Sequence, residues 1–181
     1  MWNFTDLVRG RPNVFPPDLP RSLDTLSNRL FALGHREEAL KVVQEGVAIY
    51  HDLALQRPKA FNPDLARSLN TLSNRLSSLS HREEALGVVQ ECVALYHDLA
   101  RDQPNAFNPD LARSLDTLSN CLSGPTHWEE AFKAAQACVA LCRDLARDRP
   151  NAFNPDFARS LDTLSNRLSG LGHREEALKA M

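Results

Sequence analysis

The chain of 181 residues is 43% hydrophobic and 24% charged, a composition typical of an ordinary globular protein. Its formal net charge of −2 lacks the basic excess expected of a dedicated nucleic-acid binder. No apolar run reaches the roughly 18 residues of a membrane span, and residues 1–12 lack the apolar core of a secretory signal. We therefore expect a cytoplasmic protein whose partners are neither nucleic acids nor membranes.

The sequence repeats with a period of 46 residues. Residues 61–106 and 107–152 agree at 32 of 46 positions, and a fixed period of this kind is typical of repeat architectures. We interpret the chain as one array over residues 1–181. It would consist of a partial repeat (1–14), three full repeats (15–60, 61–106 and 107–152) and a truncated repeat (153–181).

Each full repeat predicts two helices, and the second repeat gives the clearest example. Asn62, Pro63 and Asp64 form a start signal for the first helix, because Asn caps free N–H groups and Pro fits the first helical position. Leucines at alternating spacings of four and three then give one apolar stripe along this helix. These leucines are Leu65, Leu69, Leu72, Leu76 and Leu79.

A turn and a second helix follow in the same repeat. Residues 77–81 are rich in serine and predict the turn. A second apolar pattern predicts a helix over about residues 82–102, which Pro104 ends, and residues 105–110 would link this repeat to the next. No alternation of apolar and polar residues predicts a strand, so the expected fold is all-α. One helical hairpin cannot bury both its faces, and neighbouring hairpins must therefore stack.

These repeats resemble the tetratricopeptide repeat, and the resemblance covers essentially the whole chain. In the second repeat it is carried by Leu69, Leu72, Ser73 and Leu76 in the first helix, Ser80 in the turn, and Ala85, Val89, Cys92 and Pro104 later. Gly34 and Gly172 occupy the turn position of other repeats. The period of 46 exceeds the usual length of about 34 and is similar to the long-unit branch found in kinesin light chains and in fungal and bacterial arrays. The resemblance implies a right-handed α-solenoid of antiparallel helical hairpins.

The resemblance also implies that the first helices line a concave groove that binds a protein or peptide. Asn can hydrogen-bond a peptide backbone through both its donor and its acceptor, and Arg can pair with a carboxylate. The candidate peptide-binding residues are Arg21, Asn28, Arg67, Asn74, Arg113, Asn120, Arg159 and Asn166. Asp24, Asn70, Asp116 and Asp162 lie between them. The alternative is that each Arg pairs with the Asp three residues later and only keeps this face soluble.

Two groups of residues could in principle bind a metal. Histidine and glutamates recur at 35–38, 81–84, 127–130 and 173–176, but each group has one His, so we interpret them as solvated starts of the second helices. Cys138 and Cys142 are four residues apart, yet a metal site there would need further ligands. We expect free, buried thiols in a reducing compartment, and neither a metal nor another cofactor.

The third repeat departs from the others at Gly124 and Pro125, where we expect the first helix to end early. Trp128 replaces an arginine there and either covers the altered turn or anchors a partner. No catalytic or phosphate-binding motif is present in the sequence. We therefore expect a non-catalytic scaffold that binds an extended partner segment. The alternative is a structural fragment, self-associating end to end, of a larger signalling protein with an NTPase or protease-like domain, as the resemblance suggests.

Overall fold

The computed structural model describes residues 18–122 and 127–170, and within these ranges all regular secondary structure is α-helical. The helices are α2 (Asp18–Ala32), α3 (Arg36–Gln56), α4 (Pro58–Ser78), α5 (Arg82–Asp102), α6 (Pro104–Cys121), α7 (Trp128–Asp148) and α8 (Pro150–Gly170). The all-α prediction is confirmed, and α5 has the predicted bounds. None of the helices in the described ranges has the length and apolarity that crossing a membrane requires.

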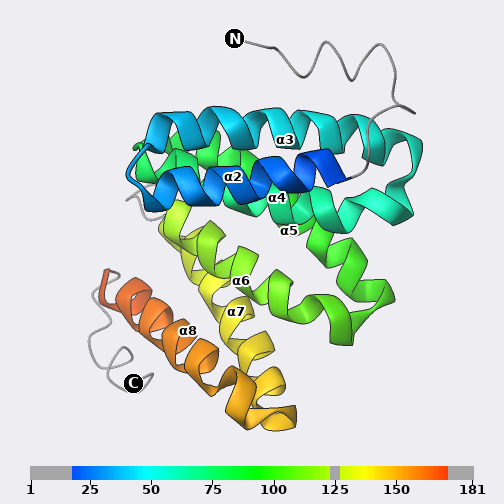
Figure 1. The fold of residues 1–181 in the computed structure, drawn as a ribbon. Helices are drawn as coiled ribbons and strands as arrows, with labels where there is room; N and C mark the ends of the chain where they lie inside the picture. Colours follow the sequence, from blue (N-terminus) through cyan, green and yellow to red (C-terminus); the bar gives the residue numbers. More distant parts are fainter. Residues whose placement is uncertain (1–17, 123–126, 171–181) are drawn as a thin grey trace. The chain divides into compact units, whose positions relative to one another are not determined.

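The chain forms two compact units, Met1–Leu95 and Tyr96–Met181, whose boundary falls inside α5. In the N-terminal unit α3 packs against both α2 and α4, and α2 also touches α4 (Figure 1). In the C-terminal unit α7 packs in the same way against α6 and α8, which touch each other. We call α2, α4, α6 and α8 the A helices and α3, α5 and α7 the B helices. The predicted antiparallel hairpins are confirmed in each unit.

The helices α4, α6 and α8 begin earlier than predicted. The start signal at Asn62-Pro63-Asp64 was wrong, because α4 begins at Pro58 and contains Pro63. Pro58 stands at the start of the helix, where a missing N–H costs nothing, whereas Pro63 removes one helical hydrogen bond. The longer helix brings Phe61 into the core, under the guanidinium of Arg57 at 4.9 Å, and this contact offsets the lost bond. Residues 105–110 likewise belong to α6 and do not form the predicted link.

The turns between α2 and α3 and between α4 and α5 each contain one residue with a left-handed backbone. Gly34 has φ 88° and Ser80, at the same position of the next repeat, has φ 66°. A residue without Cβ adopts this conformation easily, whereas a serine is strained there. In the third repeat α6 ends at Cys121, whose equivalent Arg75 lies inside α4, so the predicted early end is confirmed. Gly124, Pro125 and Gly172 lie outside the described residues.

The core combines the predicted leucine stripe with small residues. Leu65, Leu69, Leu72 and Leu76 are buried in α4, where each contributes about 1.5–3 kcal/mol of transfer free energy. Serines at the 46-residue period are buried beside them and let the helices approach closely. Four fully buried hydroxyls donate to internal acceptors, such as that of Ser27 to the Ala39 carbonyl at 2.8 Å. The buried serines are Ser27, Ser68, Ser73, Ser114, Ser119, Ser160 and Ser165.

Ser80→Gly should stabilise the chain, because glycine relieves the positive φ of the turn. We expect a gain of about 1 kcal/mol in the free energy of unfolding, measured by urea denaturation followed by circular dichroism. The reciprocal control is Gly34→Ser at the equivalent turn, which should lose a similar amount. A loss of stability in Ser80→Gly, or no loss in Gly34→Ser, would show that backbone strain does not govern these turns.

Candidate functional site

Three of the four predicted arginines of the A helices are exposed but already paired. Arg113 donates to Asp110 at 2.9 Å, and Arg67 and Arg159 pair in the same way with Asp64 and Asp156. In each pair the aspartate lies three residues before the arginine. The alternative prediction, that each arginine pairs with the residue three positions after it, was therefore right about pairing and wrong about the partner. Exposed pairs of this kind contribute only about 0–1 kcal/mol, so a competing carboxylate can displace them at little cost. The fourth arginine, Arg21, is also exposed.

Asp24, which lies in the sequence between the candidate peptide-binding residues Arg21 and Asn28, is buried between α2 and α4. Ser68 of α4 donates to its Oδ1 at 2.7 Å, while the buried Oδ2 has no partner among the described residues. Burial raises the pKa of Asp24 above its ordinary value of 3.8, and the Ser68 hydrogen bond and the charge of Arg67 partly oppose this shift. In the C-terminal unit the equivalent Asp116 accepts a hydrogen bond from Thr163 at 2.8 Å. This position therefore joins neighbouring A helices.

The predicted asparagines Asn28, Asn74, Asn120 and Asn166 are all exposed. In the N-terminal unit Arg75 donates to Asn28 Oδ1 at 2.6 Å, and in the C-terminal unit Arg167 donates to Asn120 Oδ1 at 2.7 Å. Asn74 instead donates through Nδ2 to the Asn70 carbonyl at 2.9 Å. The two Arg–Asn pairs, which we call the clamps, each connect two neighbouring A helices.

The clamp arginines were missed from the sequence. An arginine follows the asparagine in three repeats, at Arg29, Arg75 and Arg167, and Cys121 takes this place in the remaining one. This pattern was visible in the 46-residue period. The pairing was not, because each arginine contacts the asparagine 47 residues earlier, on the preceding A helix.

Arg75 is held by an aromatic ring as well as by Asn28. Its guanidinium lies 3.9 Å from the centre of the Phe31 ring, which places a positive charge over a π face. Its Nε is buried without a hydrogen-bond partner in the described part of the chain, and burial lowers the pKa of Arg75. Burial also lowers the pKa of Arg167, although the charge of Asp116 opposes this shift. Both groups remain cationic near neutrality, since arginine titrates far above pH 7.

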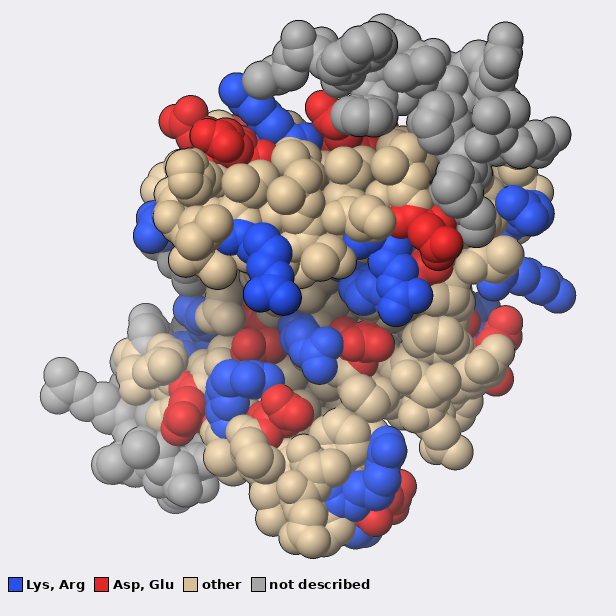
Figure 2. Space-filling view, in the orientation of Figure 1, with Lys and Arg blue, Asp and Glu red and all other residues tan. Residues whose placement is uncertain are grey.

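The charges on the molecular surface are mixed. On the face drawn in Figure 2, cationic and anionic side chains are interspersed among uncharged residues, and neither sign dominates. A surface of this kind favours short-range pairing with single charges of a partner over long-range attraction of a polyanion.

The histidine groups that the structure describes lie on the surface at the starts of B helices. His35 lies 3.4 Å from Glu38 and His81 lies 3.0 Å from Glu84, and all four side chains are exposed at the starts of B helices. The predicted solvated helix starts are confirmed for the repeats that the structure describes there. Within the described residues no three His, Cys, Asp or Glu side chains come together as metal ligands. Trp128, at the start of α7, is 49% exposed.

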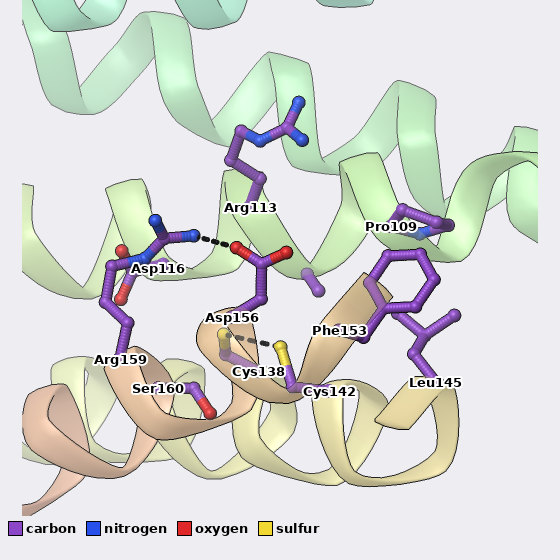
Figure 3. A pocket seen from close by; sticks show the side chains of 11 residues that line it. Pro109, Arg113, Asp116, Cys138, Cys142, Leu145, Phe153, Asp156, Arg159 and Ser160 are labelled. Atoms are coloured by element: carbon purple, nitrogen blue, oxygen red, sulfur yellow. Dashed lines mark hydrogen bonds and ion pairs between the residues drawn. The ribbon is translucent and has the colours of Figure 1, made fainter. Parts of the chain in front are cut away.

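A small cavity of about 10 Å³ lies between α6, α7 and α8. Arg113, Asp156 and Arg159 border it on one side, and the thiols of Cys138 and Cys142 on the other (Figure 3). The four cysteines all lie within the described residues and form no disulfide there. Cys138 and Cys142 are buried thiols, as predicted, and Cys92 is buried as well.

Hairpins that recur every 46 residues, with α3 and α7 each packed between two A helices, define an α-helical repeat protein. A family model for the tetratricopeptide repeat matches residues 21–54 and 65–104. These two segments are tetratricopeptide repeats, as the sequence predicts for them. A search of curated protein sequences finds no match.

Two solved structures of similar fold belong to one protein from Podosopora anserina. The nearly identical TPR-like repeats of its kinesin light chain candidate align with a TM-score of 0.68 and 18% identity, covering 97% of this chain and 78% of that one. A single-residue variant of those repeats aligns with a TM-score of 0.70 and 18% identity, covering 97% and 77%. At this identity the likeness concerns the fold alone.

Asp24→Asn should stabilise the chain at pH 7. Because the folded-state pKa of Asp24 is raised, its stabilising contribution is complete below pH 3.8 and is lost as the pH rises through the folded-state pKa. The neutral amide removes this loss, and we expect a gain on the order of 1 kcal/mol at pH 7 that shrinks toward pH 4. Urea denaturation at both pH values measures it.

The matched control for this variant is Asp162→Asn, which changes the exposed residue at the same repeat position of α8. Its effect should stay within about 0.5 kcal/mol at either pH. A loss of stability in Asp24→Asn at pH 7 would mean that the charged carboxylate supports the fold.

Proposed function

We propose that this chain is a non-catalytic scaffold whose A helices bind an extended, partly acidic segment of a partner protein. Tetratricopeptide repeats generally mediate protein–protein interaction, and this general role supports the proposal. The described cysteines form no disulfide, which supports the cytoplasmic location that we propose.

The two clamps carry this proposal. Arg75 and Arg167 bond to neutral amide oxygens of Asn28 and Asn120, and in the described part of the chain no carboxylate lies within ion-pair distance of either. Each guanidinium therefore keeps a charge that no ion pair among these residues balances, at the junction of two A helices. A carboxylate of the partner would gain a charge-assisted hydrogen bond there without displacing an existing ion pair.

The remaining candidate residues would act less strongly. Arg67, Arg113 and Arg159 must exchange an Asp of their own helix for a carboxylate of the partner, which leaves a small net gain. Asn74 and Asn166 are exposed and offer amide groups to the backbone of an extended segment. Binding would then be the sum of several modest contacts along the A helices, with the clamps contributing the largest share.

The test uses peptides selected against the wild-type chain from a displayed library of random sequences. We expect the selected peptides to be enriched in Asp and Glu. The double variant Arg75→Ala with Arg167→Ala should bind a selected peptide about tenfold or more weakly by fluorescence anisotropy, which corresponds to about 1.4 kcal/mol. Asn74→Ala with Asn120→Ala should also weaken binding and leave the circular dichroism spectrum unchanged.

The matched control replaces two arginines of B helices, Arg101 and Arg147, which are exposed and likewise 46 residues apart. Arg101→Ala with Arg147→Ala removes the same total charge and should leave affinity unchanged. If this control weakens binding as much as the clamp variant does, net charge alone drives the interaction and the proposed groove site is wrong.

A second candidate function is self-association through the surface of the α2–α3 hairpin that carries Leu26. Leu26 is 47% exposed there, whereas Leu72, at the same position of the next repeat, is 6% exposed. Leu26 borders an open hollow of about 1090 Å³, together with Leu23, Leu30 and Val42. An exposed apolar hollow of this size suits the end of a second copy, since stacked hairpins bury the same face.

Leu26→Glu tests this second function, because a charge in the hollow opposes burial against another copy. Light scattering coupled to size-exclusion chromatography should show a concentration-dependent dimer or oligomer for the wild type and a monomer for the variant. A wild-type chain that stays monomeric at every concentration would rule out self-association.

A further inference from the structure

Cys138 and Cys142 lie one turn apart on α7, and their sulfur atoms are 4.0 Å from each other. The two side chains are only 2% and 4% exposed, and both border the small cavity of the C-terminal unit (Figure 3). The volume of about 10 Å³ is about what a single water molecule needs. The cavity therefore has room for one monatomic ion and none for an organic ligand.

A disulfide between these two cysteines does not suit the helix. Residues four apart on a helix have Cβ atoms about 5–6 Å apart, whereas a disulfide requires about 3.5–4.5 Å. Forming the bond would unwind a turn of α7 in the middle of its buried face. The two cysteines therefore remain thiols, which face each other within a core cluster that also contains Ala112.

A one-atom bridge matches the observed separation. A zinc–thiolate bond is about 2.3 Å long, so two such bonds to one metal ion can join sulfur atoms up to about 4.6 Å apart. The observed sulfur–sulfur distance of 4.0 Å lies within this limit. Thiolates favour soft metals, chiefly copper(I) and zinc. Zinc demands four ligands, and within the described residues no third ligand joins this pair. Copper(I) is satisfied by two thiolates.

We propose that Cys138 and Cys142 form a two-thiolate binding site for copper(I). On binding, each thiol releases its proton to solvent and forms one sulfur–copper bond. The copper stays in its +1 state, so no oxidant or reductant takes part. Up to two protons leave for each ion bound, and affinity should therefore rise with pH.

The two thiols differ in how easily they lose their protons. The hydrogen bond from Cys138 lowers the pKa of Cys142, with help from the Ser160 hydroxyl, although burial opposes this shift. The same hydrogen bond and burial raise the pKa of Cys138, which keeps its proton until a metal replaces it. The groups that face the pair from α6 and α8 are Arg113, Asp116, Asp156, Arg159 and Ser160. Asp156 is neutralised by Arg159, so the cavity is not dominated by negative charge.

The repeat supplies its own comparison for this site. In the N-terminal unit the positions of Cys138 and Cys142 are held by Gly46 and Tyr50, and Tyr50 is almost fully buried. The intermediate repeat carries Cys92 and Tyr96, which gives one thiol and no pair. The dithiol thus occurs once in the chain, where a cysteine replaces the tyrosine.

The test titrates the reduced chain, without oxygen, into the coloured complex of copper(I) with bicinchoninate. Loss of the colour reports the ion taken by the protein. The wild type should remove one copper(I) per chain, and Cys138→Ser and Cys142→Ser should each bind about 100-fold more weakly or not at all. Cys92→Ser, with Cys121→Ser in the same chain, should still remove one ion.

Circular dichroism checks that each variant is folded, and Cys138→Ala with Cys142→Ala replaces the serine variants if these unfold. Two results would overturn the site. In one, the variants lacking the pair remove as much copper(I) as the wild type, so the two thiols only fill the core. In the other, zinc competes for the pair on equal terms, which a two-ligand site does not allow.

Discussion

Close approach of neighbouring A helices is the constraint on which the rest of the structure depends. Buried serines at a spacing of 46 residues keep the contact between helices short, and their hydroxyls bond internally. A larger side chain at Ser68 would push α4 away from α2 and separate it from Asp24. The clamp between Asn28 and Arg75 spans the same two helices, so the geometry of this surface follows from the size of a buried residue.

Because the repeats share one backbone, a single substitution can give one repeat a reactive group that the others lack. Residues 50, 96 and 142 share one place in the repeat, and only the last of them is a cysteine. Where Tyr50 fills the interior of the N-terminal unit, Cys142 leaves a cavity bordered by two thiols. Burial raises the pKa of Tyr50 to about 12, so this phenol stays neutral and acts as a packing group. The same position is thus inert in one unit and chemically distinct in the other.

The sequence predicted the features that local chemistry determines. The 46-residue period, the turn at Ser80 and the end of α5 before Pro104 all follow from propensity and periodicity. The start of α4 did not follow from local chemistry, because Asn62-Pro63-Asp64 and Pro58 are both acceptable start signals. Burial of Phe61 decides between them. Tertiary packing of one aromatic residue outweighed a good local cap.

At the candidate site, the sequence predicted which side chains are exposed but not which side chains bond to one another. The asparagines lie on a polar helical stripe, so their exposure followed from the pattern of residues. Their arginine partners lie on the next A helix, and no local rule connects residues 47 positions apart. Asp24 shows the same limit, because it looked like a surface partner of Arg21 and is instead buried against Ser68.

The two clamps are held in place by different means, and this difference bears on their function. In the N-terminal unit the ring of Phe31 lies against Arg75. The sequence has Ser123 at the corresponding position of the C-terminal unit, and Arg167 is fixed there through its Nε, which donates to Ser119 at 3.1 Å. An arginine that is already oriented loses less conformational freedom when a partner binds. Unrelated contacts thus orient the guanidinium at the equivalent position of each unit. The exposed Arg–Asn pairs themselves add little stability, so a need to point the guanidinium towards a partner explains these contacts better.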